Sequence, residues 1–293
     1  MEKRIALALG GGGVKGISHI GVLRRLEQRG FTVQSLAGTS IGALVGAFYA
    51  LGYAPDHIEE LFANFRQSQL YGKVKGEEPS LLGFNGLARR LKELVGDRTF
   101  ADLKIPFAAT ATWVEYGREV CLREGSLIEA LLASMALPGI FPMRFINGMG
   151  LVDGGMLNPV PVNAARALTT PDTPIVAIPL TAPLGVPATM ERIVLSRFIP
   201  RWLNERIKRM RLVRAADVFF LTQDMMNRAN TTHHLEASKP DLIIRPAVAH
   251  LNTLQKVDAR AIIRIGEEAV EAALPQLSKL FDTNALAQAR ADI

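Results

Sequence analysis

The sequence predicts an α/β protein built on a mainly parallel sheet. Within the first fifty residues we find a strand, a glycine loop, a helix, a second strand, a tight turn and a second helix. This βαβ order places the two strands in parallel. Further along, short apolar runs alternate with helical patterns and turn residues. Hydrophobic residues make up 48% of the 293 residues, enough to bury one large core.

Each element follows from its local pattern, taken in chain order. Strands are predicted at residues 4–9, 31–37, 107–114, 119–122, 151–153, 175–180 and 241–245. Helices are predicted at residues 15–29, 43–51, 55–65, 87–95, 126–135, 191–235 and 259–274. We therefore expect one domain over residues 1–293, with a core at 5–180 and 240–275. A basic helical elaboration is expected at about residues 190–235.

The first motif is a glycine loop at residues 10–16, Gly-Gly-Gly-Gly-Val-Lys-Gly. Glycines let backbone N–H groups converge at the start of a helix, where they can hold negative charge such as an oxyanion. Gly11, Gly13 and Gly16 also satisfy the GxGxxG fingerprint of dinucleotide-binding folds. That alternative expects a carboxylate at the end of the second strand, and residues 33–37 have none. A P-loop fails as well, because isoleucine rather than lysine follows the last glycine.

The second motif is Gly38-Thr39-Ser40-Ile41-Gly42, a GxSxG sequence between a predicted strand and a predicted helix. In a nucleophile elbow, small residues allow a sharp turn that presents the serine hydroxyl at the edge of the sheet. GxSxG matches are common by chance in glycine-rich chains. The flanking strand and helix are therefore what favour a catalytic serine here.

The third motif is Asp153-Gly154-Gly155, at the end of a short predicted strand. An Asp-Gly pair by itself is most often a turn. Its interest comes from Ser40, because a nucleophilic serine needs a base to accept its proton.

Together the three motifs resemble the patatin-like phospholipase family. The pattern is GGGxKG, then GxSxG about a helix and a strand later, then Asp-Gly-Gly more than a hundred residues on. Residues 136–139 (Ala-Leu-Pro-Gly) and 158–161 (Asn-Pro-Val-Pro) also resemble that family's segments around the aspartate. One departure is Gly10, where many members have aspartate. The resemblance covers most of the chain and implies a three-layer α/β/α patatin-like sandwich.

The resemblance further implies a lipid acyl hydrolase that uses a Ser-Asp dyad. Ser40 is then the nucleophile and Asp153 its sole partner. The implied oxyanion donors lie in the loop Gly11, Gly12 and Gly13. Supporting positions are Lys15, Gly16, Gly38, Gly42, Gly154 and Gly155. The mechanism calls for no metal and no cofactor, and phospholipids, lysophospholipids, neutral lipids and thioesters all present a suitable carbonyl.

Two alternatives to this interpretation are a different catalytic arrangement and a non-catalytic role. An α/β-hydrolase triad has the chain order Ser, Asp, His. The late histidines that could complete it are His233, His234 and His250. The early position of Ser40 argues against that triad, and His19 and His57 have ordinary structural interpretations. The other alternative is a regulator or adaptor that keeps the fold, which a lost nucleophile or base would indicate, and neither is lost here.

A separate expectation concerns charge. The chain has a net charge of +6, and residues 191–214 contain eight basic and two acidic residues, which accounts for the whole excess. Apolar residues in this stretch have helical spacing, as on a helix that lies in a lipid interface. We expect peripheral contact with an anionic membrane, against the alternative of a packed helix with a solvated basic side. No nucleic-acid-binding motif is recognisable.

The single cysteine and the apolar runs bear on location. Cys121 cannot form an internal disulfide, and we expect it to be a small buried residue. The N-terminus does not resemble a secretory signal, and the apolar runs are too short to span a bilayer. These features predict a cytoplasmic protein, peripheral at the inner membrane face.

Lys15 is a cation in the first turn of a predicted helix, where it opposes the helix dipole. It therefore either orders the glycine loop or adds positive potential, and the alternative is a solvated lysine.

Overall fold

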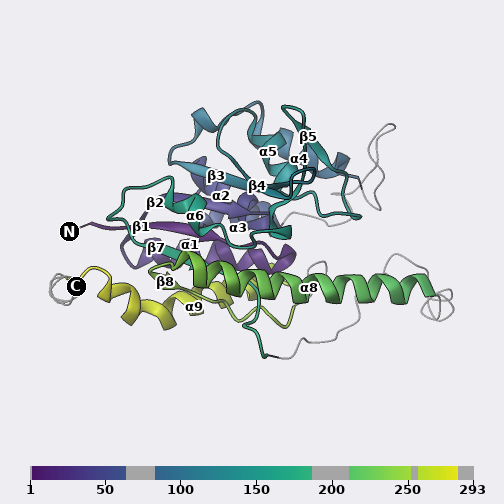
Figure 1. The fold of residues 1–293 in the computed structure, drawn as a ribbon. Helices are drawn as coiled ribbons and strands as arrows, with labels where there is room; N and C mark the ends of the chain where they lie inside the picture. Colours follow the sequence, from purple (N-terminus) through teal and green to yellow (C-terminus); the bar gives the residue numbers. More distant parts are fainter. Residues whose placement is uncertain (1, 64–82, 187–210, 252–256, 283–293) are drawn as a thin grey trace.

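The computed structural model describes residues 2–63, 83–186, 211–251 and 257–282. Within them, helices cover both faces of an eight-stranded sheet (Figure 1), as the predicted α/β fold requires. The strands are β1 Lys3–Leu9, β2 Phe31–Thr39, β3 Phe107–Trp113, β4 Arg118–Leu122, β5 Arg144–Ile146, β6 Met149–Asp153, β7 Ile175–Ile178 and β8 Leu242–Ile243. The α-helices are α1 Ser18–Gln28, α2 Ile41–Ala50, α3 Pro55–Ala63, α4 Asn85–Val95, α5 Leu127–Ser134, α6 Val162–Arg166, α8 Arg211–Ser238 and α9 Ala259–Lys279. Short 3-10 helices are η1 Gly13–Ile17, η3 Phe100–Asp102 and η4 Gly154–Met156.

The sheet is mainly parallel, as expected. Its strand order is β5-β6-β3-β2-β1-β7-β8, with β4 also paired to β3. The ladders of β1 with β2 and β7, of β2 with β3, and of β7 with β8 are parallel. The ladders of β4 and β6 with β3, and of β5 with β6, are antiparallel.

Strand β3 brings two distant parts of the chain together. Residues 107–110 of β3 pair with β2, residues 111–113 pair with β6, and residues 109–113 pair with β4. Because β4 overlaps both other partners, it occupies one edge of β3, and β2 and β6 share the opposite edge. These two strands run in opposite directions along it, so their carboxyl ends meet. Thr39 pairs with Thr110, and Asp153 pairs with the next residue, Ala111.

The two faces of the sheet bury side chains of different size. On β1, Ile5, Leu7 and Leu9 belong to the larger apolar cluster, which includes residues of α1, α2, α5 and α9. Ala6 and Ala8 point into a second, smaller cluster with residues of α6 and α8. Alternation on a strand therefore sorts large residues to one face and small ones to the other. The result is the three-layer α/β/α arrangement.

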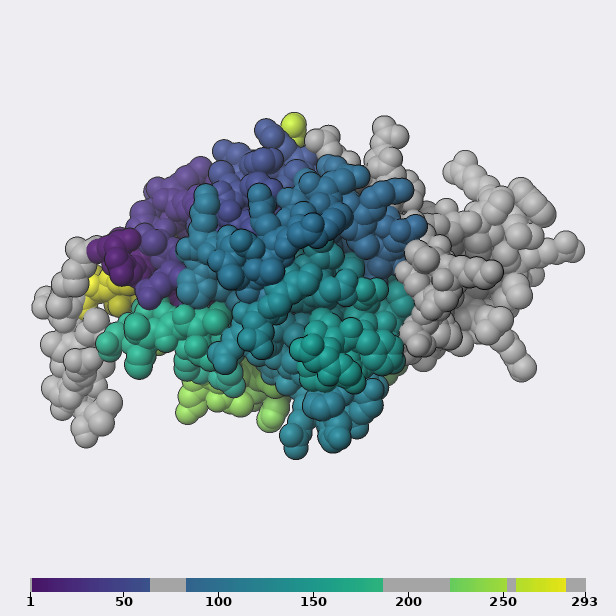
Figure 2. Space-filling view, turned by 90° about the horizontal axis from the view of Figure 1, so that it is seen from above, coloured from purple at the N-terminus to yellow at the C-terminus, as the bar shows by residue number. Residues whose placement is uncertain are grey.

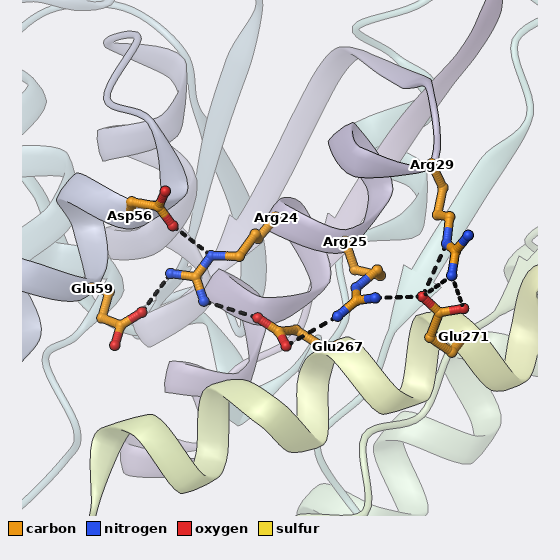
Figure 3. Close-up of polar contacts among 7 residues, drawn as sticks. All are labelled: Arg24, Arg25, Arg29, Asp56, Glu59, Glu267 and Glu271. Carbon is orange, nitrogen blue, oxygen red and sulfur yellow. Dashed lines mark hydrogen bonds and ion pairs between the residues drawn. The ribbon is translucent and has the colours of Figure 1, made fainter.

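Helix α9 packs closely against α1. A Cβ atom on Gly21 would lie 1.9 Å from the carbonyl oxygen of Ile263, and one on Gly266 would lie 2.0 Å from that of Ser18. The two glycines therefore let the backbones approach to contact distance. Beside this crossing, arginines of α1 and carboxylates of α3 and α9 form a ladder of ion pairs (Figure 3). Its members are Arg24, Arg25, Arg29, Asp56, Glu59, Glu267 and Glu271.

Several elements differ from the sequence-based expectation. The short β5 and α6 were not predicted, and β7 ends two residues early. Helix α9 continues through Pro275 to Lys279, and buried Leu277 anchors this last turn in the core. Cys121 is exposed on β4, contrary to expectation, because β4 pairs only with β3 in the described sheet and Cys121 does not face the core.

The surface of the molecule includes the α4–β6 segment on one face and helix α8 beside the sheet (Figure 1, Figure 2). Figure 2 shows the face on which the α4–β6 segment (blue to teal) forms much of the surface. Helix α8 runs along the sheet, and its far end extends beyond the α/β core (Figure 1). No helix in the described ranges combines the length and the apolar character that crossing a membrane requires. Residues 191–210 of the basic stretch, and the side chains of residues 211–214, lie outside the described residues.

Candidate active site

Ser40 lies at a sharp turn between β2 and α2. Its backbone has φ 56° and ψ −120°, a conformation that a non-glycine residue adopts only at an energetic cost. The flanking glycines make the turn possible. A Cβ on Gly38 would lie 2.4 Å from the nitrogen of Ala43, and one on Gly42 would lie 2.3 Å from the carbonyl oxygen of Leu9. The GxSxG sequence therefore forms the elbow that was predicted for it.

Asp153 is brought to Ser40 by the end-to-end meeting of β2 and β6. Asp153 is 6% exposed, its carboxylate accepts a hydrogen bond from the Gly155 N–H at 2.7 Å, and the Ser40 side chain lies close enough to lower its pKa. Burial raises the pKa of Asp153 from 3.8 to about 6, while the Ser40 side chain and the Gly155 N–H oppose that rise. Gly154 is required here, since its Cβ would lie 2.5 Å from the carbonyl oxygen of Thr110.

The glycine loop passes directly beside the serine. A Cβ on Gly11 would lie 3.3 Å from the Cβ of Ser40. The N–H of Gly11 donates to the carbonyl of Pro159 at 2.9 Å, so this amide is already used. Gly12 and Gly13 follow at the start of η1, where the first N–H groups of a helix have no intrahelical acceptor. Of the three predicted oxyanion donors, Gly12 and Gly13 are therefore better suited to the role than Gly11.

The other predicted supporting positions also lie in the site. A Cβ on Gly16 would lie 2.2 Å from Cγ2 of Ile41, so this glycine lets η1 pack on the first residue of α2. Lys15 is 5% exposed, and its Nζ lies 3.9 Å from Oδ1 of Asp224 on α8. The alternative of a solvated lysine is therefore wrong. Burial lowers the pKa of Lys15, Asp224 raises it, and Arg228 lowers it.

Three supporting contacts had no signal in the sequence. The hydroxyl of Ser134, at the end of α5, accepts a hydrogen bond from the backbone N–H of Ser40 at 2.9 Å. The hydroxyls of Thr39 and Thr110 are 2.7 Å apart, and Thr39 donates to the carbonyl of Asn158 at 3.1 Å. These contacts hold the elbow from three directions. Each joins residues at least seventy positions apart, which no local pattern marks.

Four of the five histidines contact groups other than Asp153 in the described structure, and His250 is exposed. His19 is fully buried, its Nε2 lies 2.8 Å from the carbonyl oxygen of Gly10, and burial lowers its pKa to about 4. A neutral ring therefore donates to the end of β1 and anchors the glycine loop. The rings of His57 and Tyr53 make a T-shaped contact, and so do the rings of His233 and His234. Within the described residues, the groups that interact with the Asp153 carboxylate are the Ser40 side chain and the backbone N–H of Gly155.

Comparisons with known proteins bear on the same residues. An uncharacterized NTE family protein of Mycobacterium tuberculosis is 31% identical over 211 residues, covering 70% of this chain and 56% of that protein. Human patatin-like phospholipase domain-containing protein 6 is 34% identical over 171 residues, covering 56% of this chain and 12% of that protein. This chain thus spans about half the length of the mycobacterial relative and far less of the human one.

A solved structure and a family model complete the comparison. The crystal structure of VipD from Legionella pneumophila aligns with a TM-score of 0.54 at 15% identity, over 96% of this chain and 67% of that chain, which shows a shared fold. Residues 7–166 match the model described as patatin-like phospholipase. That range begins in β1 and ends with α6, so it contains the glycine loop, the Ser40 elbow and the Asp153 turn. The chain belongs to the patatin-like phospholipase family.

Proposed function

We propose that this chain is a serine acyl hydrolase that cleaves a lipid ester, with Ser40 as nucleophile and Asp153 as general base. The observation that carries the proposal is the contact between a strained elbow serine and a buried carboxylate. Family membership supports a lipid substrate. So does a relative named lysophospholipase NTE1 from Mycosarcoma maydis, 30% identical over 178 residues that cover 56% of this chain and 9% of that protein.

The proposed reaction has two halves. The Ser40 hydroxyl attacks the ester carbonyl as its proton passes to Asp153, and the N–H groups of Gly12 and Gly13 stabilise the resulting oxyanion. The tetrahedral intermediate collapses, and the leaving alcohol takes the proton from Asp153. Water then attacks the acyl-enzyme, Asp153 accepts its proton, and collapse of the second intermediate releases the fatty acid and returns the proton to Ser40.

The raised pKa of Asp153 suits this role. A carboxylate with a pKa near 3.9 is a weak base toward a serine hydroxyl. At about 6, the carboxyl is still ionised at neutral pH and is a stronger base when it is. The absence of a histidine from its described side-chain partners favours the Ser-Asp dyad over a Ser-Asp-His triad. Retention of both dyad residues favours an enzyme over an adaptor.

A peripheral contact with anionic membrane is part of the proposal. It rests on the charge of residues 191–214, eight basic and two acidic. Basic residues near an anionic surface contribute about 1 kcal/mol each, so several together support reversible binding. Such contact would bring the site to its lipid.

The experiment that tests the proposal is covalent labelling with a fluorophosphonate, followed by peptide mapping. We expect the label on Ser40 and expect Ser40→Ala to abolish both labelling and hydrolysis of p-nitrophenyl butyrate. The fold should survive, because the change removes one oxygen atom. Ser278→Ala, the same substitution on α9, is the matched control and should label like the wild type.

Two further variants separate the dyad from a triad. Asp153→Asn should lower kcat by at least about a hundredfold, since an amide cannot accept the serine proton. Alanine at each of the five histidines should leave the labelling site unchanged. Labelling that persists in Ser40→Ala would refute the nucleophile assignment. A variant at His57, His233, His234 or His250 as inactive as Ser40→Ala would refute the dyad, whereas His19→Ala is not decisive because the buried His19 ring anchors the glycine loop.

A further inference from the structure

Helix α8 lies outside the residues that match the family model, yet it contacts both parts of the candidate active site. The side chains of Gln223 and Asn230 donate to Met156, at Sδ (3.3 Å) and at the carbonyl oxygen (3.1 Å). Met156 ends η4, the turn that Asp153 begins. Asp224 pairs with Lys15 in the glycine loop. Gln223 and Asn230 are seven residues apart, so both project from one face of the helix.

Lys15 is the side chain in this contact whose charge is hardest to maintain. Lys15 is buried within η1, the 3-10 helix that Gly13 begins, and a Cβ on Gly12 would lie 3.5 Å from the Cβ of Lys15. Burying a cation without a counter-charge is unfavourable. Within the described residues, the charged groups that face Lys15 are Asp224 and Arg228, both on α8. Asp224 favours the charged form of Lys15 and Arg228 disfavours it, so among these described groups one carboxylate supports the protonation of Lys15.

Asp224 is itself held in place. The Arg228 guanidinium lies on the next turn of α8, with Nε 2.7 Å from Oδ2 of Asp224. Arg228 is 8% exposed and also donates to the carbonyl of Val186 at 2.9 Å. The Asp224 carboxylate is thus fixed between two cations, one on its own helix and one in the glycine loop.

We infer that Asp224 is a positioning residue of the candidate active site, which keeps Lys15 charged and in place beside the proposed oxyanion donors. This inference rests on the proposed function. A fixed positive charge near the loop stabilises negative charge that develops on the substrate in the transition state. Asp224 contributes by acting on Lys15, not on the substrate. Helix α8 then becomes a required part of the catalytic unit, although the family model ends before it.

The test compares Asp224→Asn with Glu236→Gln, which removes one negative charge from an exposed position on the same helix. We expect Asp224→Asn to lower kcat for p-nitrophenyl butyrate by about tenfold or more, with KM changed less than about threefold. The alkaline limb of the pH profile should move to lower pH, because Lys15 loses its proton more easily without Asp224. Asp224→Glu should restore most activity, and Glu236→Gln should match the wild type in kcat and alkaline limb.

Each result decides the inference. Wild-type kcat in Asp224→Asn overturns it, and so does a lower kcat with an unmoved alkaline limb, which indicates a structural effect alone.

If Asp224→Asn does not fold, the double variant Lys15→Met, Asp224→Asn replaces it. Activity equal to that of Lys15→Met alone supports the coupling, whereas an additional loss overturns it. If the wild type is not labelled at Ser40, the proposed function fails and the inference fails with it; wild-type labelling with no effect of Asp224 refutes only the inference.

Discussion

At the scale of single residues, the site combines strain with burial. Ser40 occupies a backbone conformation that most residues avoid, and Asp153 is an ionisable group held almost entirely out of water. Both conditions reduce stability, and both serve the proposed chemistry: the turn exposes the hydroxyl, and burial makes the carboxylate a better base. Sites that store strain in this way are common where function requires it.

The raised pKa of Asp153 predicts how activity depends on pH. The proposed base must be ionised, so activity should rise with pH through a midpoint near 6, the pKa of the folded state. The measurement is kcat/KM for p-nitrophenyl butyrate from pH 4.5 to pH 8. A midpoint near 4, the value of an ordinary carboxyl group, would contradict the assignment of Asp153 as the base.

The same pKa predicts that Asp153→Asn stabilises the fold. Between pH 3.8 and about 6 the folded state holds a proton that the unfolded state has lost, so the stability of the wild type falls as pH rises. Above pH 6 this loss is complete and amounts to about 2–3 kcal/mol. The Asp153→Asn variant does not have this pH-dependent loss of stability. Its stability relative to the wild type should therefore increase from pH 4 to pH 7.5. The measurement is urea unfolding at both pH values, and a gain independent of pH would contradict the prediction.

At the scale of elements, the loops of the candidate site depend on close approach between backbones. Helix α1 follows the glycine loop directly, and α9 holds α1 through the Gly21–Gly266 crossing and the ion-pair ladder. Arg24 alone contacts carboxylates on two helices, Asp56 and Glu59 on α3 and Glu267 on α9 (Figure 3). A helix far from the site in sequence therefore supports the position of the loop.

The close approach of α1 and α9 predicts that Gly266→Ala destabilises the fold, the opposite of its effect in an exposed helix. In an exposed helix this change stabilises by about 1 kcal/mol. Here the new Cβ would lie 2.0 Å from the carbonyl oxygen of Ser18, so the helices must separate, and we expect a loss of about 1–3 kcal/mol. Urea unfolding measures it. Ala272→Gly, at an exposed position of α9, reports the propensity effect alone, and a Gly266→Ala variant more stable than the wild type would contradict the packing argument.

At the scale of the whole molecule, the segments after the family-matched range complete the structure. Strand β8 extends the sheet beside β7, α9 packs on α1, and α8 reaches the site. A single domain over residues 1–293 remains a prediction. The basic stretch of residues 191–214 overlaps the start of α8, and this N-terminal end of the helix extends beyond the core (Figure 1).

Membrane contact is tested by co-sedimentation with anionic and zwitterionic vesicles at low and high salt. We expect preferential binding to anionic vesicles at low salt, because exposed charges are screened within about 8 Å at physiological ionic strength. Glutamate at Arg201, Lys208, Arg209 and Arg211 should weaken binding at least about tenfold. The control carries glutamate at exposed Arg89, Arg98, Arg123 and Arg264, with the same total charge change. Equal binding by the two variants would show that total charge, not this stretch, determines lipid contact.

The sequence alone determined the fold class, and it predicted the residues and chemistry of the candidate site. Strand and helix patterns depend on neighbouring residues, and the GxSxG turn requires small residues at fixed spacing, so both are visible locally. Only the tertiary structure decided which groups meet. The pairing of Ala111 with Asp153, the use of the Gly11 amide by Pro159, and the pairing of Lys15 with Asp224 join residues 42 to 209 positions apart. Such contacts arise from strand register and helix packing, which depend on the whole core at once.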